Sequence, residues 1–192
     1  MPDSFSSAIF PLSSSQQEAM RGVSWHEDLP GPALSELCSL RIPFIDFAGQ
    51  TQLGTLITRD NLSEELAEVF AQLHRIAFPI ASIRPMVDFG GDDGLSMAAN
   101  NSSCFNSRRI RGTTRISLHA LGAAVDINPV QNPVVRDGEI RPDEGRKFCK
   151  RLHPCPGMIV DGSEIVSIFA EAGWKWGGHW NNPVDYHHFF RE

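Results

Sequence analysis

The sequence has few of the features that mark several common protein classes. It contains four cysteines in 192 residues, and no apolar run approaches the roughly 18 residues of a membrane-spanning helix. The N-terminus lacks the basic segment and apolar stretch of a secretion signal. Four scattered cysteines do not indicate a disulfide scaffold. We therefore expect no membrane span, synthesis in the cytoplasm without a signal peptide, and thiols that are reduced or form a single bridge.

Basic residues are outnumbered by acidic ones. The chain has 17 Lys and Arg against 23 Asp and Glu, a formal net charge of -6. Because no basic field is available to displace phosphate counterions, we expect no nucleic-acid partner. The arginines within 108–115 form a local basic patch, and most of them are expected to lie in a solvated loop.

The remaining composition is that of one globular domain. Hydrophobic residues make up 41% of the chain and charged residues 21%, and 192 residues can bury a sizeable core. Residues 1–28 are expected to be a loose arm, rich in Ser and Gln, ahead of a single domain over 29–192. Strands and helices do not alternate regularly, so the pattern predicts an α+β fold with a central antiparallel sheet and flanking helices.

Local patterns place the expected elements. The strongest is a helix over 60–77, in which apolar residues from Leu62 to Ile76 recur at helical spacing. Helices are further expected at 33–40, 142–152 and 163–172, and strands at 42–47, 53–58, 80–87 and 123–127. The stretch 88–114 is mostly Gly, Asp, Asn and Ser. So long a loop before a candidate site predicts a substrate-binding segment.

That candidate site begins in Ser117–Asn128. His119 and Asp126 lie there, and Asp185 and His188 follow near the C-terminus. Two His and one Asp suit a catalytic zinc whose fourth position is left to water. We therefore predict one Zn²⁺ per chain, held by His119, Asp126 and His188. Asp185 would be the general base for the metal-activated water.

Spacing constrains how these residues can meet. Seven residues of helix would separate His119 from Asp126 by about 10 Å, and seven of strand by more than 20 Å. The chain must therefore turn between them, and Gly122 is where a turn costs least. The segment before Asp185 is expected to bend, so that Asp185 and His188 share one cleft. His187 is then expected to point away.

Other interpretations of these residues remain open. A histidine is more often a hydrogen-bonded core residue than a metal ligand, so His119 and His188 could belong to a structural domain. Cys149, His153 and Cys155 could in principle hold a second metal, but their spacing fits no common zinc motif.

The combined motifs resemble a known family. Ser117-x-His119-x-x-Gly122-x-Ala124-x-Asp126 is followed by Trp176-Gly-Gly-x-Trp180 and Asp185-x-x-His188-Phe189. This pattern is similar to the zinc D-Ala-D-Ala carboxypeptidase family, which includes the L-alanyl-D-glutamate endopeptidases of phage lysis. Segments 96–106 and 126–133 resemble its VanY-like branch, and the similarity extends over about 42–190.

The resemblance implies a D-Ala-D-Ala-peptidase/Hedgehog-like fold and the same zinc ligands. It places the catalytic carboxylate at Asp185, where many members have Glu. It also implies an arginine, Arg84, that binds the substrate carbonyl and the developing oxyanion. The alternative for Arg84 is a salt bridge to Asp88 or to the Asp92–Asp93 pair. Further candidates for substrate contact are Ser117 (which could instead orient His119), Trp176, Trp180, Asn100, Asn101 and Phe105, with the tryptophans otherwise in the core.

The sequence thus predicts a zinc peptidase domain over 29–192 that cuts peptidoglycan stem peptides at bonds involving D-amino acids. The competing hypothesis is a cell-wall-binding module that keeps the fold and metal but has lost catalysis. Carboxypeptidase and endopeptidase activity are not distinguished by residues alone. A cell-wall substrate without a signal peptide implies another export route, such as a phage holin or a secretion apparatus, the latter with an immunity protein as a further partner.

Overall fold

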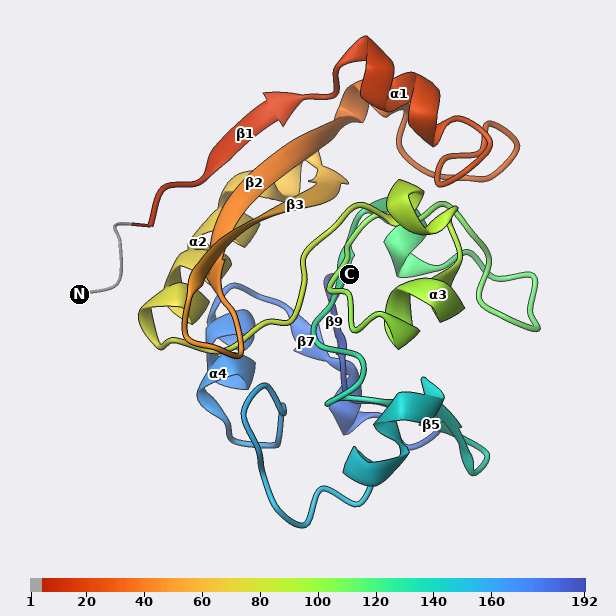
Figure 1. Ribbon diagram of the computed structural model, residues 1–192. Coiled ribbons are helices and arrows are strands. Elements are labelled where there is room, and N and C mark those ends of the chain that lie inside the picture. The colour runs from red at the N-terminus through yellow and green to blue at the C-terminus, as the bar shows by residue number, and fades with distance from the viewer. Residues whose placement is uncertain (1–4) are drawn as a thin grey trace.

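The computed structural model describes residues 5–192 and shows an α+β fold (Figure 1). The strands are β1 (Ala8–Pro11), β2 (Leu37–Ile45), β3 (Thr51–Arg59), β4 (Ala124–Asp126), β5 (Val134–Arg136), β6 (Glu139–Arg141), β7 (Lys175–Trp176), β8 (Val184–Asp185) and β9 (His188–Phe190). The helices are α1 (Ser14–Met20), α2 (Asp60–Arg75), α3 (Asp93–Ala98) and α4 (Glu164–Glu171), with 3-10 turns η1 (Leu34–Glu36), η2 (Met86–Phe89), η3 (Leu118–Leu121), η4 (Asp143–Phe148) and η5 (Gly177–His179).

The predicted α+β class and antiparallel pairing are confirmed, but the strands are divided among three small sheets instead of one central sheet. The sheet orders are β1-β2-β3, β4-β9-β7 and β6-β5-β8, with every neighbouring pair antiparallel. The second and third sheets contain two of the predicted metal ligands, Asp126 and His188, and the predicted base Asp185, whereas His119 lies in η3. No helix among residues 5–192 is long and apolar enough to cross a membrane.

The β2–β3 hairpin is the longest paired segment. It runs in register from Leu37 opposite Arg59 to Ile45 opposite Thr51. The Asp46 side chain closes its turn by accepting hydrogen bonds from the backbone N–H groups of Ala48 and Gln50. The predicted strands 42–47 and 53–58 are thus confirmed. The predicted helix 33–40 is wrong, because only the single turn η1 precedes a strand that is paired on both edges.

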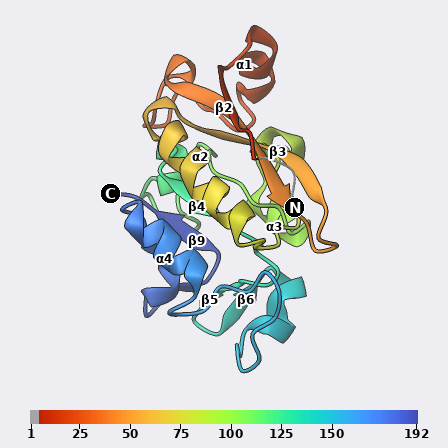
Figure 2. The ribbon, with the colours of Figure 1, turned by 90° about the vertical axis from the view of Figure 1, so that its left-hand side faces the viewer.

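Helix α2 confirms the predicted 60–77 helix and organises the main core. Its apolar face buries Leu66, Val69, Phe70 and Leu73. Figure 2 shows α2 and α4 beside one another, and residues of β2, β4 and β9 join the same hydrophobic cluster. Burial of one such side chain contributes about 1.5–3 kcal/mol. The core therefore supports the short strands β4 and β9, which carry metal-ligand candidates.

The expected loose arm over 1–28 is wrong for its central part. Strand β1 pairs with β2, and α1 begins with a capping box in which Ser13 and Gln16 exchange hydrogen bonds. Leu12 and Met20 are buried in a second cluster with Phe105. These two apolar anchors fix the segment against the hairpin. The polar composition of the arm did not reveal them. Residues 1–4 lie outside the described part of the chain.

Two further elements differ from expectation. The segment 80–87 forms no strand; Pro79 and Ile83 make only isolated bridges, to Ile45 and Ser102, and η2 follows. The predicted helix 142–152 is only the 3-10 turn η4, whereas the predicted helix 163–172 is confirmed as α4. Ile80 and Ile83 of this segment are nevertheless buried in the main core.

Gly122 is the turn that the sequence predicted. It lies at the left-handed φ of 64° directly after η3, and β4 begins two residues later. A Cβ at this position would lie 2.9 Å from the backbone nitrogen of Arg59. The glycine therefore satisfies both a left-handed conformation and a close approach to β3.

We expect the Gly122→Ala substitution to destabilise the protein more than Gly162→Ala. Both residues have left-handed φ values, of 64° and 71°, which should cost about 1–2 kcal/mol with alanine. Only Gly122 is packed against backbone, and overpacking adds about 1–3 kcal/mol. Urea unfolding of the two variants measures the difference. Equal losses would show that the contact with Arg59 relaxes freely.

Candidate metal centre and cleft

The three predicted ligands come from separate elements that meet at one point. His119 lies in η3, and Asp126 ends β4. His188 begins β9 directly opposite Asp126 in the antiparallel ladder. Directly opposed residues have Cβ atoms about 4.5–5.5 Å apart. The ladder therefore brings the C-terminal histidine to the aspartate, and the Gly122 turn returns His119 to both.

The ligand atoms of these residues form a compact triangle. His119 Nε2 lies 3.2 Å from His188 Nδ1 and 3.2 Å from Asp126 Oδ2, and His188 Nδ1 lies 2.9 Å from Asp126 Oδ1. Within residues 5–192 this is the one cluster of three or more such side chains with ligand atoms within 4.8 Å. Zinc bonds of about 2 Å in tetrahedral geometry separate ligand atoms by about 3.3 Å. The donor set and its spacing fit zinc.

The histidine orientations also fit a metal. His119 Nδ1 lies 2.5 Å from the backbone carbonyl of Cys104, to which it donates. This hydrogen bond leaves the lone pair of His119 Nε2 facing His188 and Asp126. A carbonyl behind a histidine fixes the ring orientation in many metal sites. Two imidazole nitrogens facing each other at 3.2 Å need a cation or a proton between them.

Burial and charge shift the pKa values of this cluster in opposite directions. Burial would raise the pKa of Asp126, but the charges of His119 and His187 and hydrogen bonds from His119 and His188 hold it well below its usual value. Burial would lower the pKa of His119, but attraction and hydrogen bonding to Asp126 raise it above its usual value. The site thus favours the ionised carboxylate of Asp126 and the protonated imidazole of His119.

We expect the metal-free protein to show a corresponding pH dependence of stability. The raised pKa of His119 contributes stability below its usual value of 6.5, lost as pH rises through the folded-state pKa. The lowered pKa of Asp126 contributes stability above its usual value of 3.8, lost as pH falls through the folded-state pKa. The contribution is therefore largest between about pH 4 and 6.5. Thermal unfolding with a chelator at several pH values checks this. Greater stability at pH 8 than at pH 6 would contradict it.

Asp185 lies beside this triangle. It is on β8, its side chain is 16% exposed, and its Oδ1 is 3.0 Å from His187 Nε2. The ring geometry makes no hydrogen bond there, so Oδ1 is buried without a hydrogen-bond partner among residues 5–192. Oδ1 is thus turned toward His187, while the carboxylate as a whole lines the cleft and can meet a substrate group or water there.

His187 faces the site, which the sequence interpretation did not expect. Its Nδ1 donates to the backbone carbonyl of Asn132 at 2.7 Å, and its Nε2 lies 3.8 Å from Asp126 Oδ2. Strand alternation was the reason for pointing it away. However, β9 begins only at His188, and residues 186–187 form a turn. The alternation therefore does not apply to His187.

Arg84 is not brought to the ligands in this structure. Its Nε donates to Asp88 Oδ2 at 3.0 Å, and its side chain is 55% exposed. This is the salt bridge that the sequence left as an alternative. Its backbone is held by Asn101, whose amide accepts from Arg84 N–H at 2.9 Å and donates to its carbonyl at 3.0 Å. Asn101 lines the cleft, but its side chain is committed to these contacts.

The remaining predicted contacts divide between cleft and core. Ser117 lines the cleft, and its hydroxyl accepts a hydrogen bond from the backbone N–H of His119, so it orients the ligand segment. Trp180 lines the cleft, and its ring centroid lies 5.4 Å from that of His188. Trp176 and Phe105 lie in the hydrophobic clusters, 5% and 2% exposed, and line no part of the cleft. For these two, the core alternative holds.

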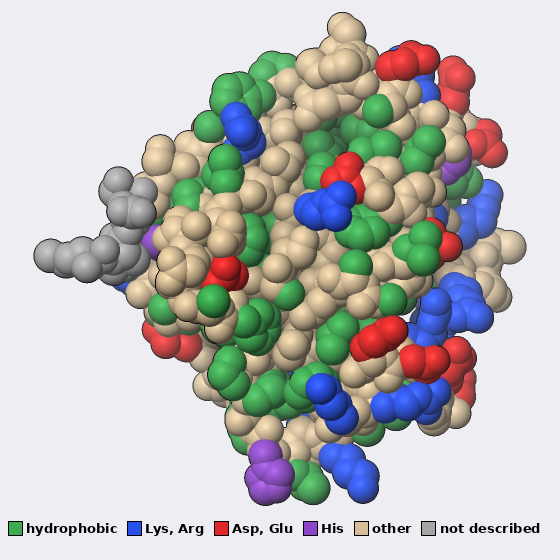
Figure 3. All heavy atoms as spheres, viewed as in Figure 1, with side chains coloured by type: hydrophobic (Ala, Val, Ile, Leu, Met, Phe, Trp, Pro, Cys, Tyr) green, Lys and Arg blue, Asp and Glu red, His purple; other side chains and the backbone are tan. Residues whose placement is uncertain are grey.

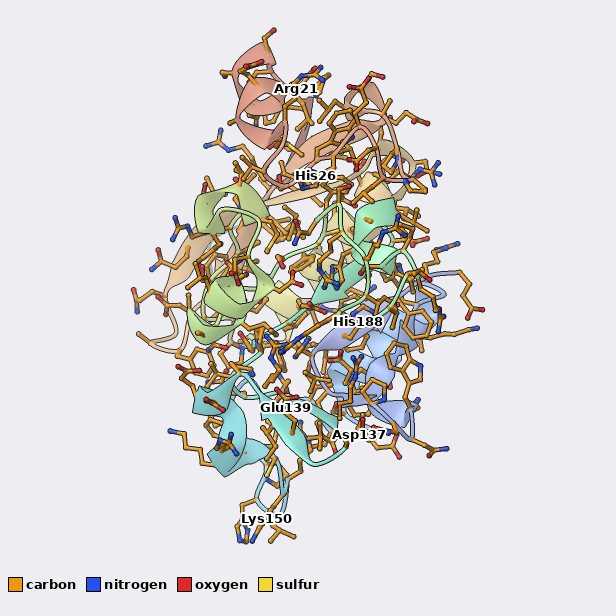
Figure 4. All side chains as sticks on the ribbon, turned by 90° about the vertical axis from the view of Figure 1, so that its right-hand side faces the viewer. Arg21, His26, Asp137, Glu139, Lys150 and His188 are labelled. Carbon is orange, nitrogen blue, oxygen red and sulfur yellow. The ribbon has the colours of Figure 1, made fainter. Side chains whose placement is uncertain are left out.

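The three candidate metal ligands open into a cleft of about 1130 Å³. One wall is formed by α3 and the segment 108–118, and the other by the β5–β6 hairpin and β8. Figure 4 shows His188 near the middle of this side of the molecule, with Glu139 of the hairpin below it. The predicted role of 88–114 in lining a substrate site agrees with this wall. A cleft of this size accommodates several residues of a peptide.

Residues 111–190 match the family model described as D-alanyl-D-alanine carboxypeptidase. This match supports the D-alanyl-D-alanine carboxypeptidase family. The matched range contains the three ligands and Asp185, so the peptidase resemblance rests on the segment that builds the site. It does not extend to Arg84, and it is shorter than the 42–190 similarity expected from the motifs. No curated protein and no solved structure matches the chain.

The carboxypeptidase family match gives no role to the cysteines. All four are free, and burial raises the pKa of the Cys104 thiol to about 12. Cys149, His153 and Cys155 form no metal cluster in the described part of the chain. The cleft also contains groups that the sequence interpretation missed, above all His187 and the arginines of the β5–β6 hairpin. The Asp137-Gly138 pair, a typical hairpin turn signal, would have located that hairpin.

Proposed function

We propose that this chain is a zinc peptidase that hydrolyses peptidoglycan stem peptides at bonds involving D-amino acids. His119, Asp126 and His188 would hold the metal, and Asp185 would be the general base. The convergence of these three ligand atoms at the floor of a peptide-sized cleft is the observation that carries the proposal. The carboxypeptidase family match over the same residues supports the peptide substrate.

The residues of the chain would divide the chemistry as follows. Zinc supplies a Lewis acid that polarises the scissile carbonyl and lowers the pKa of a water. Asp185 would accept the proton of the attacking water on its carboxylate, which lines the cleft, and deliver it to the leaving amine. His119, fixed by the Cys104 carbonyl, and Asp126, fixed by the β4–β9 ladder, keep the ligand geometry rigid. Trp180 lies beside His188, with ring centroids 5.4 Å apart, and would shield one side of it from water.

The alternative is a cell-wall-binding module of the same fold that lacks catalysis. Asp185 argues against it. Its carboxylate lines the cleft beside the ligand cluster, with Oδ1 3.0 Å from His187 Nε2. A module that only binds has no use for such a carboxylate.

Because the substrate would be in the cell wall, we propose that the protein acts there after export. The route would be a holin or a secretion apparatus. With a secretion apparatus, an immunity protein would be a further partner.

Digestion of purified muropeptides, followed by mass spectrometry, tests the proposal. Zinc-loaded wild-type protein is expected to release D-alanine or a stem-peptide fragment. The Asp185→Ala variant should leave the same peptides uncut. If wild type and variant both leave every peptide intact, hydrolysis is excluded. If both cut at equal rates, Asp185 is not the base.

A further inference from the structure

Arg136 and Arg141 lie on the cleft-facing side of the β5–β6 hairpin. Val134, Arg136, Glu139 and Arg141 line the cleft, whereas the alternate residues of the same strands do not. This alternation is what strands with one face toward a cavity require. The two arginines therefore point to the same space as the metal ligands, and Figure 4 shows Glu139 of this hairpin on the same side as His188.

The sheet register relates Arg141 to the proposed base. Val134 pairs with Arg141 on one side and with Asp185 on the other. These three residues thus form one row across three adjacent strands. Strands lie about 4.8 Å apart, so the Cα atoms of Arg141 and Asp185 are separated by about 10 Å. An extended peptide advances about 3.3–3.6 Å per residue. Arg141 therefore lies about two to three substrate residues away from a scissile bond placed beside Asp185.

Neither arginine has a carboxylate partner among residues 5–192, although both are half-buried. Of the other arginines that line the cleft, Arg108 pairs with Asp93 and Arg111 lies 3.8 Å from Glu139, whereas Arg109 and Arg115 have no carboxylate partner among residues 5–192 but are exposed and hydrated. A partly buried cation without a partner loses hydration without compensation. In a chain of net charge -6, such a pair in the cleft indicates a negatively charged ligand.

Arg141 also reaches the opposite wall. A Cβ on Gly94 of α3 would lie 3.7 Å from Arg141 Nη2, so the guanidinium extends across the cleft. The nearby Asp92 carboxylate accepts from the backbone N–H of Leu95 at 3.0 Å and makes no ion pair with Arg141. Figure 3 shows basic and acidic side chains interspersed toward the right-hand edge, the side of α3 and the hairpin. The Arg141 guanidinium therefore lies between the hairpin and α3 at the cleft.

We propose that Arg141, assisted by Arg136, binds a carboxylate of the substrate, so that the cleft selects peptides with a free carboxylate two to three residues from the scissile bond. The planar guanidinium can bind a carboxylate through two parallel hydrogen bonds. This inference rests on the proposed peptidase function, because it takes the ligand of the cleft to be a peptide. In a stem peptide the carboxylate is either the C-terminal one or the α-carboxylate of the D-glutamyl residue.

Calorimetric binding to the zinc-loaded Asp185→Asn protein tests this without substrate turnover. The ligands are a synthetic stem pentapeptide, its C-terminal amide, and the same peptide with the D-glutamyl α-carboxylate amidated. The free acid is expected to bind about 10- to 100-fold more tightly than the amide that lacks the carboxylate bound by Arg141. This is the range for loss of one hydrogen bond to a charged group. Adding Arg141→Gln should weaken binding of the free acid by the same factor and leave that amide unaffected. Arg141→Lys should restore part of the affinity.

Arg146→Gln is the matched control, because Arg146 is exposed, pairs with Asp143 and does not line the cleft. It should leave all three affinities unchanged. If the wild-type cleft binds the three peptides equally, or Arg141→Gln and Arg136→Gln weaken all three alike, the inference is overturned. The muropeptide digest is independent of this result: hydrolysis without charge-dependent binding overturns only this inference, and binding without hydrolysis overturns only the proposed peptidase.

Discussion

Replacing Asp185 with asparagine is expected to lower kcat by about 100- to 10,000-fold, the range for loss of a positioned general base. Asparagine is nearly the same size and can neither accept the proton of the attacking water nor return it to the leaving amine. The zinc content should remain unchanged, because Asp185 is not one of the three clustered ligands. Steady-state kinetics on a stem peptide, with zinc measured in the same samples, checks both statements.

Asp161→Asn is the control for this variant. Asp161 is an exposed carboxylate that contacts His179 at 2.9 Å and lies outside the cleft. Its replacement should leave kcat within about twofold, as most surface substitutions have small effects. A full kcat in Asp185→Asn would assign proton transfer to another group, and His187, 3.0 Å from Asp185, would be the next candidate.

Replacing His188 with alanine is expected to weaken zinc binding by more than about 100-fold and to abolish hydrolysis. His188 lies opposite Asp126 in the ladder and supplies one corner of the ligand triangle. Removing only a group behind a zinc ligand already costs about 10- to 100-fold in affinity. Competition with a chromogenic chelator measures the change.

His179→Ala is the matched histidine control. His179 is exposed, and its nearest charged partner is Asp161, away from the ligand cluster. The zinc affinity of the His179→Ala protein should equal that of the wild type. If His188→Ala retains wild-type zinc affinity, the metal is bound elsewhere, and the proposed ligand set is wrong.

The position of the site could be predicted because its motifs combine with strong backbone constraints. His119 and Asp126 cannot share an ion without a turn, and Gly122 provides it at a left-handed φ. The most periodic helix, α2, was likewise predictable from its apolar face. In both cases the local sequence leaves few conformations available, but the choice of His119, Asp126 and His188 as ligands rested on the family resemblance, and the β4–β9 ladder brings His188 to Asp126.

The parts that were missed depend on contacts between distant segments. Residues 33–40 suggested a helix, but β2 there is paired with both β1 and β3. The arm before it is fixed by Leu12 and Met20, two anchors in a polar stretch. His187 faces the site only because the turn at 186–187 interrupts strand alternation. Long-range pairing of this kind overrides local propensity.

The oxyanion role of Arg84 stays a prediction that rests on the family resemblance. Its position suggested an oxyanion contact, yet its guanidinium pairs with Asp88. It also lies outside the 111–190 match to the carboxypeptidase family. The arginines that do line the cleft, Arg136 and Arg141, follow from the hairpin register and not from any motif.

The central claim is that the triangle of His119, Asp126 and His188 holds a zinc on which peptide hydrolysis depends. The most direct test removes metal from the purified wild-type protein with a chelator and then measures muropeptide hydrolysis as zinc is added back. The expected result is no hydrolysis by the metal-free protein and a rate that saturates at about one zinc per chain. Full hydrolysis without metal, or none at any zinc concentration by a folded protein, would contradict the claim.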